Sequence, residues 1–103
     1  MTRRGRIVNR PQLAWLHTQP CVVHRNFSCS RRLTVHHVKQ CPGAQKDDTR
    51  GVPLCAEMHL HDFGMESIER LGRRKWEARF GIDLESEIRR LNELWQDAKK
   101  LAA

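Results

Sequence analysis

The chain has 103 residues, of which 39% are hydrophobic and 30% are charged, and its formal net charge is +7. This composition is typical of one small soluble globular domain and argues against a disordered chain. No apolar run approaches the roughly 18 residues of a membrane span, and no apolar signal stretch follows the basic N-terminus. We therefore expect a cytoplasmic protein without a membrane partner.

The positive charge is concentrated in the first half of the chain. Residues 1–50 carry ten lysines and arginines against two acidic residues, whereas residues 51–103 carry nine against ten. A basic half beside a nearly neutral half favours an oriented surface for a polyanion, and nucleic acid is the first candidate. The alternative is a merely soluble basic protein.

The first half is predicted to contain a basic arm, a short helix and two strands. Residues 1–10 form the flexible arm, and a short helix or turn is predicted for residues 11–20, between two prolines. The β-branched segments 21–24 and 32–38 are predicted strands. Segment 39–51, with its proline, glycines and aspartates, is predicted to be a loop.

The second half is predicted to be helical after a brief extended piece at residues 52–55. Residues 56–63 are predicted to form a short helix, and residues 66–80 a longer one that Gly81 ends. A last helix, 83–103, opens on an aspartate N-cap and carries an apolar stripe. We expect this stripe to pack on the same domain, with a homodimer contact as the alternative. The stripe consists of Leu84, Ile88, Leu91, Leu94, Trp95, Ala98 and Leu101.

Two adjacent histidines, His36 and His37, lie in the second predicted strand, and Leu54-Cys55-x-x-x-His59 follows the loop. Neighbouring side chains of a strand point to opposite faces, so the two imidazoles are expected to have different tasks. Hydrolysis of a phosphodiester needs a cation and a base that activates water. Imidazole has a neutral fraction at pH 7 and can supply either a ligand or the base.

The stretches TVHHV and VPLCAEMH together resemble HNH endonucleases of the ββα-metal (His-Me finger) superfamily, the small phage-borne ones most of all. The resemblance spans residues 10–85 and implies an α+β fold whose nuclease domain covers residues 11–82. It implies His36 and His59 as ligands of Mg²⁺ or Mn²⁺, with Zn²⁺ or Ni²⁺ as further options, and His37 as general base. The implied activity is a metal-dependent DNA endonuclease or nickase of phage or prophage origin. A packaging or recombination protein is a further candidate partner.

The sequence departs from the family pattern at two positions of the predicted active site. The family's middle asparagine would fall near Arg50, and Asp48 either replaces it by bracing the loop or is a plain turn aspartate. Many relatives carry a histidine four residues after the helical one, where this chain has Phe63. His61 and Asp62 are therefore held in reserve as metal ligands, although a histidine two positions along a helix points away.

Cysteines and histidines in a chain without an export signal favour a metal site over disulfides. Relatives often carry two Cys-x-x-Cys pairs that clamp the hairpin. The corresponding pairs here are Cys21-Val-Val-His24 and Cys55-Ala-Glu-Met58, and methionine is a poor zinc ligand. The preferred tetrahedral zinc set is Cys21, His24, Cys29 and Cys55. The alternative is a degenerate site that a hydrophobic core has replaced.

Basic residues around the predicted hairpin are expected to contact phosphates, with salt-sensitive affinity and little sequence selectivity. A catalytically inactive, zinc-stabilised nucleic-acid-binding module of the same fold is the alternative to the nuclease, and such a module would not need His37. The candidate nucleic-acid contacts are Arg3, Arg4, Arg6, Arg25, Arg31, Arg32, Lys39 and Lys46.

Overall fold

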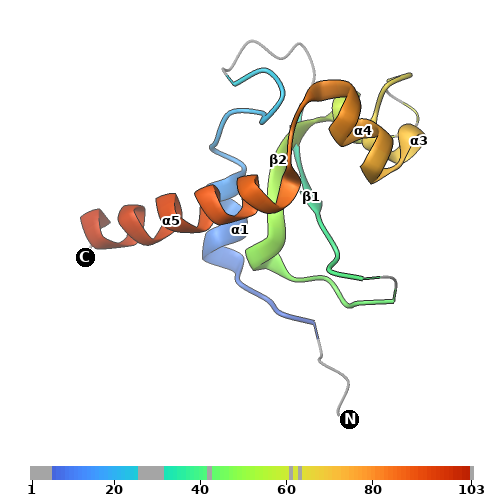
Figure 1. The fold of residues 1–103 in the computed structure, drawn as a ribbon. Helices are drawn as coiled ribbons and strands as arrows, with labels where there is room; N and C mark the ends of the chain where they lie inside the picture. Colours follow the sequence, from blue (N-terminus) through green and yellow to red (C-terminus); the bar gives the residue numbers. More distant parts are fainter. Residues whose placement is uncertain (1–5, 26–31, 42, 61, 63, 103) are drawn as a thin grey trace.

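The computed structural model describes residues 6–25, 32–41, 43–60, 62 and 64–102. Within these residues a two-stranded antiparallel sheet is surrounded by helices (Figure 1), so the expected α+β class is confirmed. Three of the predicted site residues, Cys29, Arg31 and His61, lie outside the described residues, as do Arg3 and Arg4 of the predicted basic arm.

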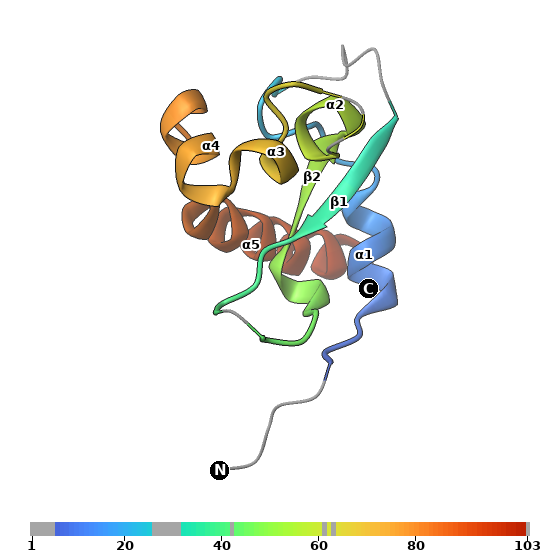
Figure 2. The ribbon, with the colours of Figure 1, turned by 90° about the vertical axis from the view of Figure 1, so that its right-hand side faces the viewer.

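A β-hairpin that leads directly into a helix forms the centre of the fold (Figure 2). The strands pair antiparallel, with Leu33 opposite Cys55 and His37 opposite Gly51. The connection between them ends in a 3-10 turn, η1, and the helix α2 starts at the residue after β2. The bounds are β1 Leu33–His37, η1 Asp48–Arg50, β2 Gly51–Cys55 and α2 Ala56–His59.

The predicted first helix is present as α1, Arg10–Leu16, with a proline in its first turn. The predicted strand at 21–24 is wrong, because these residues form a turn. The Arg25 backbone amide donates to the Cys21 carbonyl oxygen at 2.7 Å, and Arg25 has a left-handed φ of 59°. The turn closes on itself through this hydrogen bond, and the Val22 backbone amide donates to the Pro53 carbonyl oxygen of β2 at 3.0 Å without continuing into a paired strand.

The single helix predicted for residues 66–80 is also wrong, because the structure has two helices there. They are α3, Ile68–Leu71, and α4, Arg73–Phe80. Gly72 between them has φ 82°, a value that ends the first helix. Glycine adopts this positive φ without the steric cost that other residues would incur. The predicted C-cap is confirmed, since Gly81 ends α4 in the left-handed conformation.

The last helix is α5, Leu84–Ala102, and Asp83 caps it by accepting from the Glu85 backbone amide at 3.2 Å. The first half of its apolar stripe, Leu84, Ile88 and Leu91, belongs to the core. The second half is more open: Leu94 is 40% and Leu101 89% exposed, so the homodimer contact remains a prediction.

The core lies between the hairpin and the helices on either side of it. Both α1 and α5 contact β2 and η1, while α2 contacts both strands. Within the described part of the chain, no helix combines the length and apolar character that a membrane span requires. The largest fully buried side chains include Trp76, Leu16, Leu54, Leu84, Val22 and Val52.

Candidate active site and metal cluster

The two faces of β1 separate the adjacent histidines. Thr34 and His36 share one face because they are two residues apart, and His37 points to the other. Since α2 follows β2 without a loop, His59 at its end comes back over the face that carries His36. The ring centroids of His36 and His59 are 4.9 Å apart and their planes cross at 67°. The structure therefore brings together the two histidines predicted to hold a cation.

A hydroxyl group determines which nitrogen of His59 is available. Thr34 Oγ1 donates its only hydrogen to the Leu54 carbonyl oxygen at 2.6 Å, and it also lies 2.7 Å from His59 Nδ1. It must therefore accept a hydrogen from Nδ1. In neutral His59 this leaves the lone pair on Nε2, away from Thr34. An imidazole held by its other nitrogen is the usual arrangement of a histidine that binds a metal.

Both histidines on this face are disposed to be neutral. Burial, followed by the neighbouring His59 and His37, lowers the pKa of His36 to about 4. Burial also lowers the pKa of His59. A metal ligand must be unprotonated, so these two side chains are ready to bind a cation at neutral pH without first losing a proton.

One acidic residue that the sequence analysis did not single out also acts on this pair. The negative charge of Glu69 on α3 favours the protonated forms of His36 and His59, although burial outweighs it in both. The same negative charge would also favour a cation bound by the two histidines. Its only sequence signal is a place in the predicted helix 66–80, among other charged residues.

On the opposite face, His37 pairs with a fully buried carboxylate. His37 Nε2 lies 2.9 Å from Asp48 Oδ1, and Asp48 is 0% exposed. The other oxygen, Oδ2, accepts from the Asn9 backbone amide at 2.8 Å. Asp48 is therefore neither a plain turn residue nor a solvated one, and it braces the histidine itself. Its contact with His37 spans eleven residues of the chain.

The ionisation of Asp48 determines the tautomer of His37. Burial alone would raise the pKa of Asp48, but the hydrogen bonds from Asn9 and His37 hold it below the usual range. A carboxylate can only accept, so His37 Nε2 carries the hydrogen. Neutral His37 then has its lone pair on Nδ1, which is the atom able to take a proton from water.

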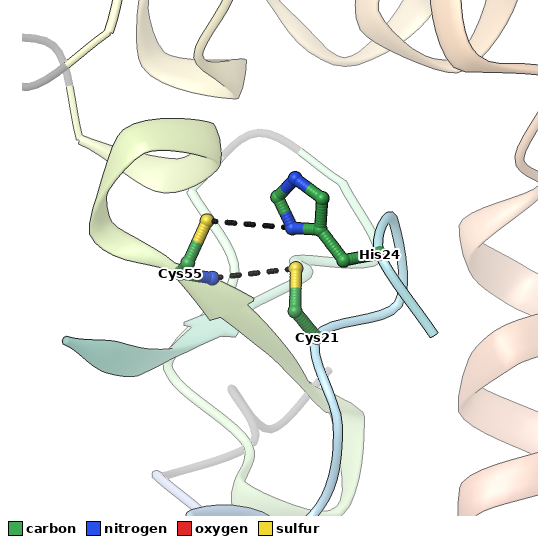
Figure 3. A group of neighbouring side chains, drawn as sticks. All are labelled: Cys21, His24 and Cys55. Carbon is green, nitrogen blue, oxygen red and sulfur yellow. Dashed lines mark hydrogen bonds between the residues drawn. The ribbon is translucent and has the colours of Figure 1, made fainter. Parts of the chain in front are cut away.

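A second cluster forms where β2 ends (Figure 3). It lies at the opposite end of the strand from Gly51, the partner of His37. Single ligand atoms of Cys21, His24 and Cys55 all lie within 4.8 Å of one another. Cys55 Sγ is 3.9 Å from His24 Nδ1, and the Cys55 amide donates to Cys21 Sγ at 3.5 Å. With usual zinc bond lengths, tetrahedral S and N ligands would be about 3.6 Å apart. The cluster could therefore bind a metal ion.

The other predicted residues are distributed around these two centres. Arg25 forms an ion pair with Glu87 at 2.8 Å. Asp62 is exposed and lies on the wall of a cleft with Glu57 and Glu66. Arg50, at the position of the family's asparagine, pairs through its guanidinium with Glu85. The exposed basic candidates within the described residues are Arg6, Arg25, Arg32, Lys39 and Lys46.

Comparisons with protein-family models, with curated proteins and with solved structures found no match for this chain.

The lowered pKa of His36 predicts how stability depends on pH when no divalent cation is added. Below pH 6.5 the unfolded chain protonates this histidine, whereas the folded chain resists until about pH 4, so stability falls on acidification. At pH 5 we expect this group to cost about 2 kcal/mol. Urea unfolding at pH 7 and pH 5 should show a smaller loss in His36→Asn than in the wild type, and equal losses would contradict the prediction.

Proposed function

We propose that this chain is a metal-dependent nuclease that hydrolyses phosphodiester bonds in DNA through an HNH-type site. The observation that carries the proposal is the arrangement of the two histidines on opposite faces of β1. His36 contacts His59 on one face, while His37 contacts the buried Asp48 on the other. A hairpin that runs directly into a helix supports the resemblance to the ββα-metal fold.

The chain's own residues would carry the proton chemistry. His37 accepts a proton at Nδ1 from the attacking water, and the imidazolium that forms is stabilised by the Asp48 carboxylate at Nε2. The hydrogen bond to Asp48 also fixes the orientation of the ring, so that Nδ1 points away from the Asp48 carboxylate. This pairing of a base with an orienting carboxylate is a general device of hydrolytic sites.

The residues of the opposite face fit a divalent cation. His36 and His59 would hold it through neutral nitrogens, and Glu69 adds negative charge nearby. A cation bound there would neutralise charge on the phosphate and on the leaving oxygen. Asp62 and His61 remain reserve ligands. Mg²⁺ and Mn²⁺ prefer oxygen ligands, so most of their remaining positions would be filled by water and phosphate oxygens.

The net charge of +7 supports a nucleic acid as substrate. Arg6, Arg32, Lys39 and Lys46 are exposed and would contact phosphates. Arg25 is the weakest of the candidates, since it is already paired with Glu87.

Supercoiled plasmid tests the proposal. The purified chain is incubated with plasmid and Mg²⁺ or Mn²⁺, beside an EDTA control and the double variant His36→Ala/His59→Ala. We expect nicking that depends on the metal and is lost in the double variant. A wild type that binds the plasmid without nicking it in any divalent metal would contradict the nuclease.

Thr34→Val tests the tautomer argument at the cation site. Valine has nearly the same shape but cannot accept the hydrogen of His59 Nδ1, so the orientation of His59 becomes less defined. We expect Mn²⁺ affinity to fall by about 10–100-fold, as for other partners of metal-bound histidines. Titration followed by electron paramagnetic resonance measures it, and unchanged affinity would contradict the role of Thr34.

The second candidate function is a zinc-stabilised nucleic-acid-binding module without catalysis, which the Cys21, His24 and Cys55 cluster favours. Such a module would bind labelled duplex DNA with an affinity that falls steeply with salt. Binding that is kept in the wild type without any nicking, together with a bound metal at the cysteines, would favour this function over the nuclease.

A further inference from the structure

A closed circuit of hydrogen bonds lies behind Asp48 and joins η1 to α1 and α5. Asp48 accepts from the Asn9 backbone amide at 2.8 Å, and the Asn9 side chain donates to Gln12 Oε1 at 3.1 Å. Gln12 Nε2 donates to Asn92 Oδ1 at 2.7 Å. Asn92 Nδ2 donates in turn to the Thr49 carbonyl oxygen at 2.8 Å. Thr49 follows Asp48 in the chain, so the circuit closes.

Every amide in this circuit has only one workable orientation. Asn92 Nδ2 also donates to the Ile88 carbonyl oxygen at 2.9 Å, so turning the Asn92 amide over would face its oxygen toward two carbonyls. Asn9 Oδ1 accepts from the Gln12 backbone amide at 3.2 Å. Gln12 is 2% exposed, and a buried polar group that loses its partner is costly. The hydrogen bonds of the circuit therefore define the orientation of each of these side chains.

A second contact from α5 holds the other end of η1. The Arg50 guanidinium pairs with Glu85, one end donating to Glu85 Oε1 at 3.0 Å, while Arg50 Nε donates to the Val38 carbonyl oxygen at 2.9 Å. Thus α5 contacts η1 at two residues: Asn92 bonds to Thr49, and Glu85 pairs with Arg50. Asp48, the residue that meets His37, begins the same turn.

We propose that Asn92, together with Gln12, is a positioning residue for His37, so that α5 serves the active site and not only the core. This role rests on the function proposed above. The hydrogen bond from Asn92 to the Thr49 carbonyl oxygen holds η1 so that the Asp48 carboxylate lies against His37 Nε2. Asn92 contacts η1 at the Thr49 carbonyl oxygen, and it acts on His37 through that turn.

Asn92→Asp in the full chain is the direct test. The substitution keeps the shape but turns an oxygen toward the carbonyls of Thr49 and Ile88, so η1 is pushed away. We expect kcat for plasmid nicking to fall by about 10–100-fold with KM unchanged, because small misplacements of a catalytic group cost this much. We also expect the imidazole ¹⁵N shifts of His37 to move from a single Nε2–H tautomer toward a mixture. Gln12→Glu, which removes the donor to Asn92, should reproduce both changes if Asn92→Asp folds poorly.

Leu91→Val is the matched control, since it lies next to Asn92 on α5 but packs in the core. It should lose stability without changing kcat or the His37 shifts. Wild-type kcat and wild-type shifts in both Asn92→Asp and Gln12→Glu would overturn the inference. If the wild type does not nick plasmid, the proposed function fails, whereas the ¹⁵N shifts still decide whether Asn92 positions His37.

Discussion

Replacing His37 with alanine is expected to lower the rate of plasmid nicking by about 10²–10⁴-fold while leaving DNA affinity unchanged. The variant removes the imidazole that lies 2.9 Å from Asp48, and therefore the Nδ1 atom proposed to take a proton from water. Single-turnover nicking and fluorescence anisotropy with labelled DNA measure the two quantities. A rate that survives in His37→Ala would place the base elsewhere, with His61 as the next candidate.

Two further variants distinguish the contribution of Asp48 from that of His37 and from a general effect of removing a histidine. Asp48→Asn still offers an oxygen to His37 but loses the charge and one of the two acceptors, so we expect a loss of up to about 10⁴-fold, no larger than that of His37→Ala. His17→Ala is the matched control, because His17 is exposed at the end of α1 and should keep the full rate. Equal losses in all three variants would indicate a general fault of folding.

The placement of His36 and His37 on a strand could be predicted from the sequence because local signals determine it. A β-branched run predicted β1, and strand alternation predicted that His36 and His37 lie on opposite faces. The same alternation places Thr34 on the face of His36, so the hydroxyl under His59 could have been found from spacing alone. Glu69 could not, since nothing local indicates that α3 approaches α2.

The predictions that were wrong, and the contacts that could not be predicted, depend on backbone geometry and on long-range contacts. Residues 21–24 have strand-like composition, but their turn is fixed by the Arg25 amide and by side chains that converge with Cys55. The helical spacing of apolar residues predicted one helix across Gly72. This spacing contains no information on the positive φ of Gly72, which separates α3 from α4. Asn92 is 43 residues from Thr49, and no sequence spacing predicts that pair.

The hairpin is held at both ends of β2. At its start, Gly51 lies opposite His37, and a Cβ there would meet Val35 Cγ1 at 2.7 Å, so only glycine allows this close approach. At its end, Cys55 enters the cluster with Cys21 and His24. A metal at that cluster would fasten the turn after α1 to the strand that leads into α2, and so fix the helix that carries His59.

Removing that metal is therefore expected to have the second large effect, on stability. Structural zinc sites supply free energy comparable to the about 5–15 kcal/mol that holds a domain folded. We expect one equivalent of metal in the purified protein, measured by elemental analysis, and a fall in Tm of more than about 10 °C after chelation. His24→Ala should have the same effect: His24 is exposed, so the variant removes a ligand without opening a cavity in the core.

Cys41→Ser is the control that separates metal binding from cysteine content, because Cys41 is exposed and outside the cluster. It should keep both the metal and the wild-type Tm. Cys29→Ser tests the predicted fourth ligand in the same assay and should lose metal if that residue completes the set. Protein that contains no metal, with a Tm indifferent to chelator and to His24→Ala, would favour the degenerate site. The hydrophobic packing of Val22, Leu54 and Trp76 would then hold the hairpin without a metal.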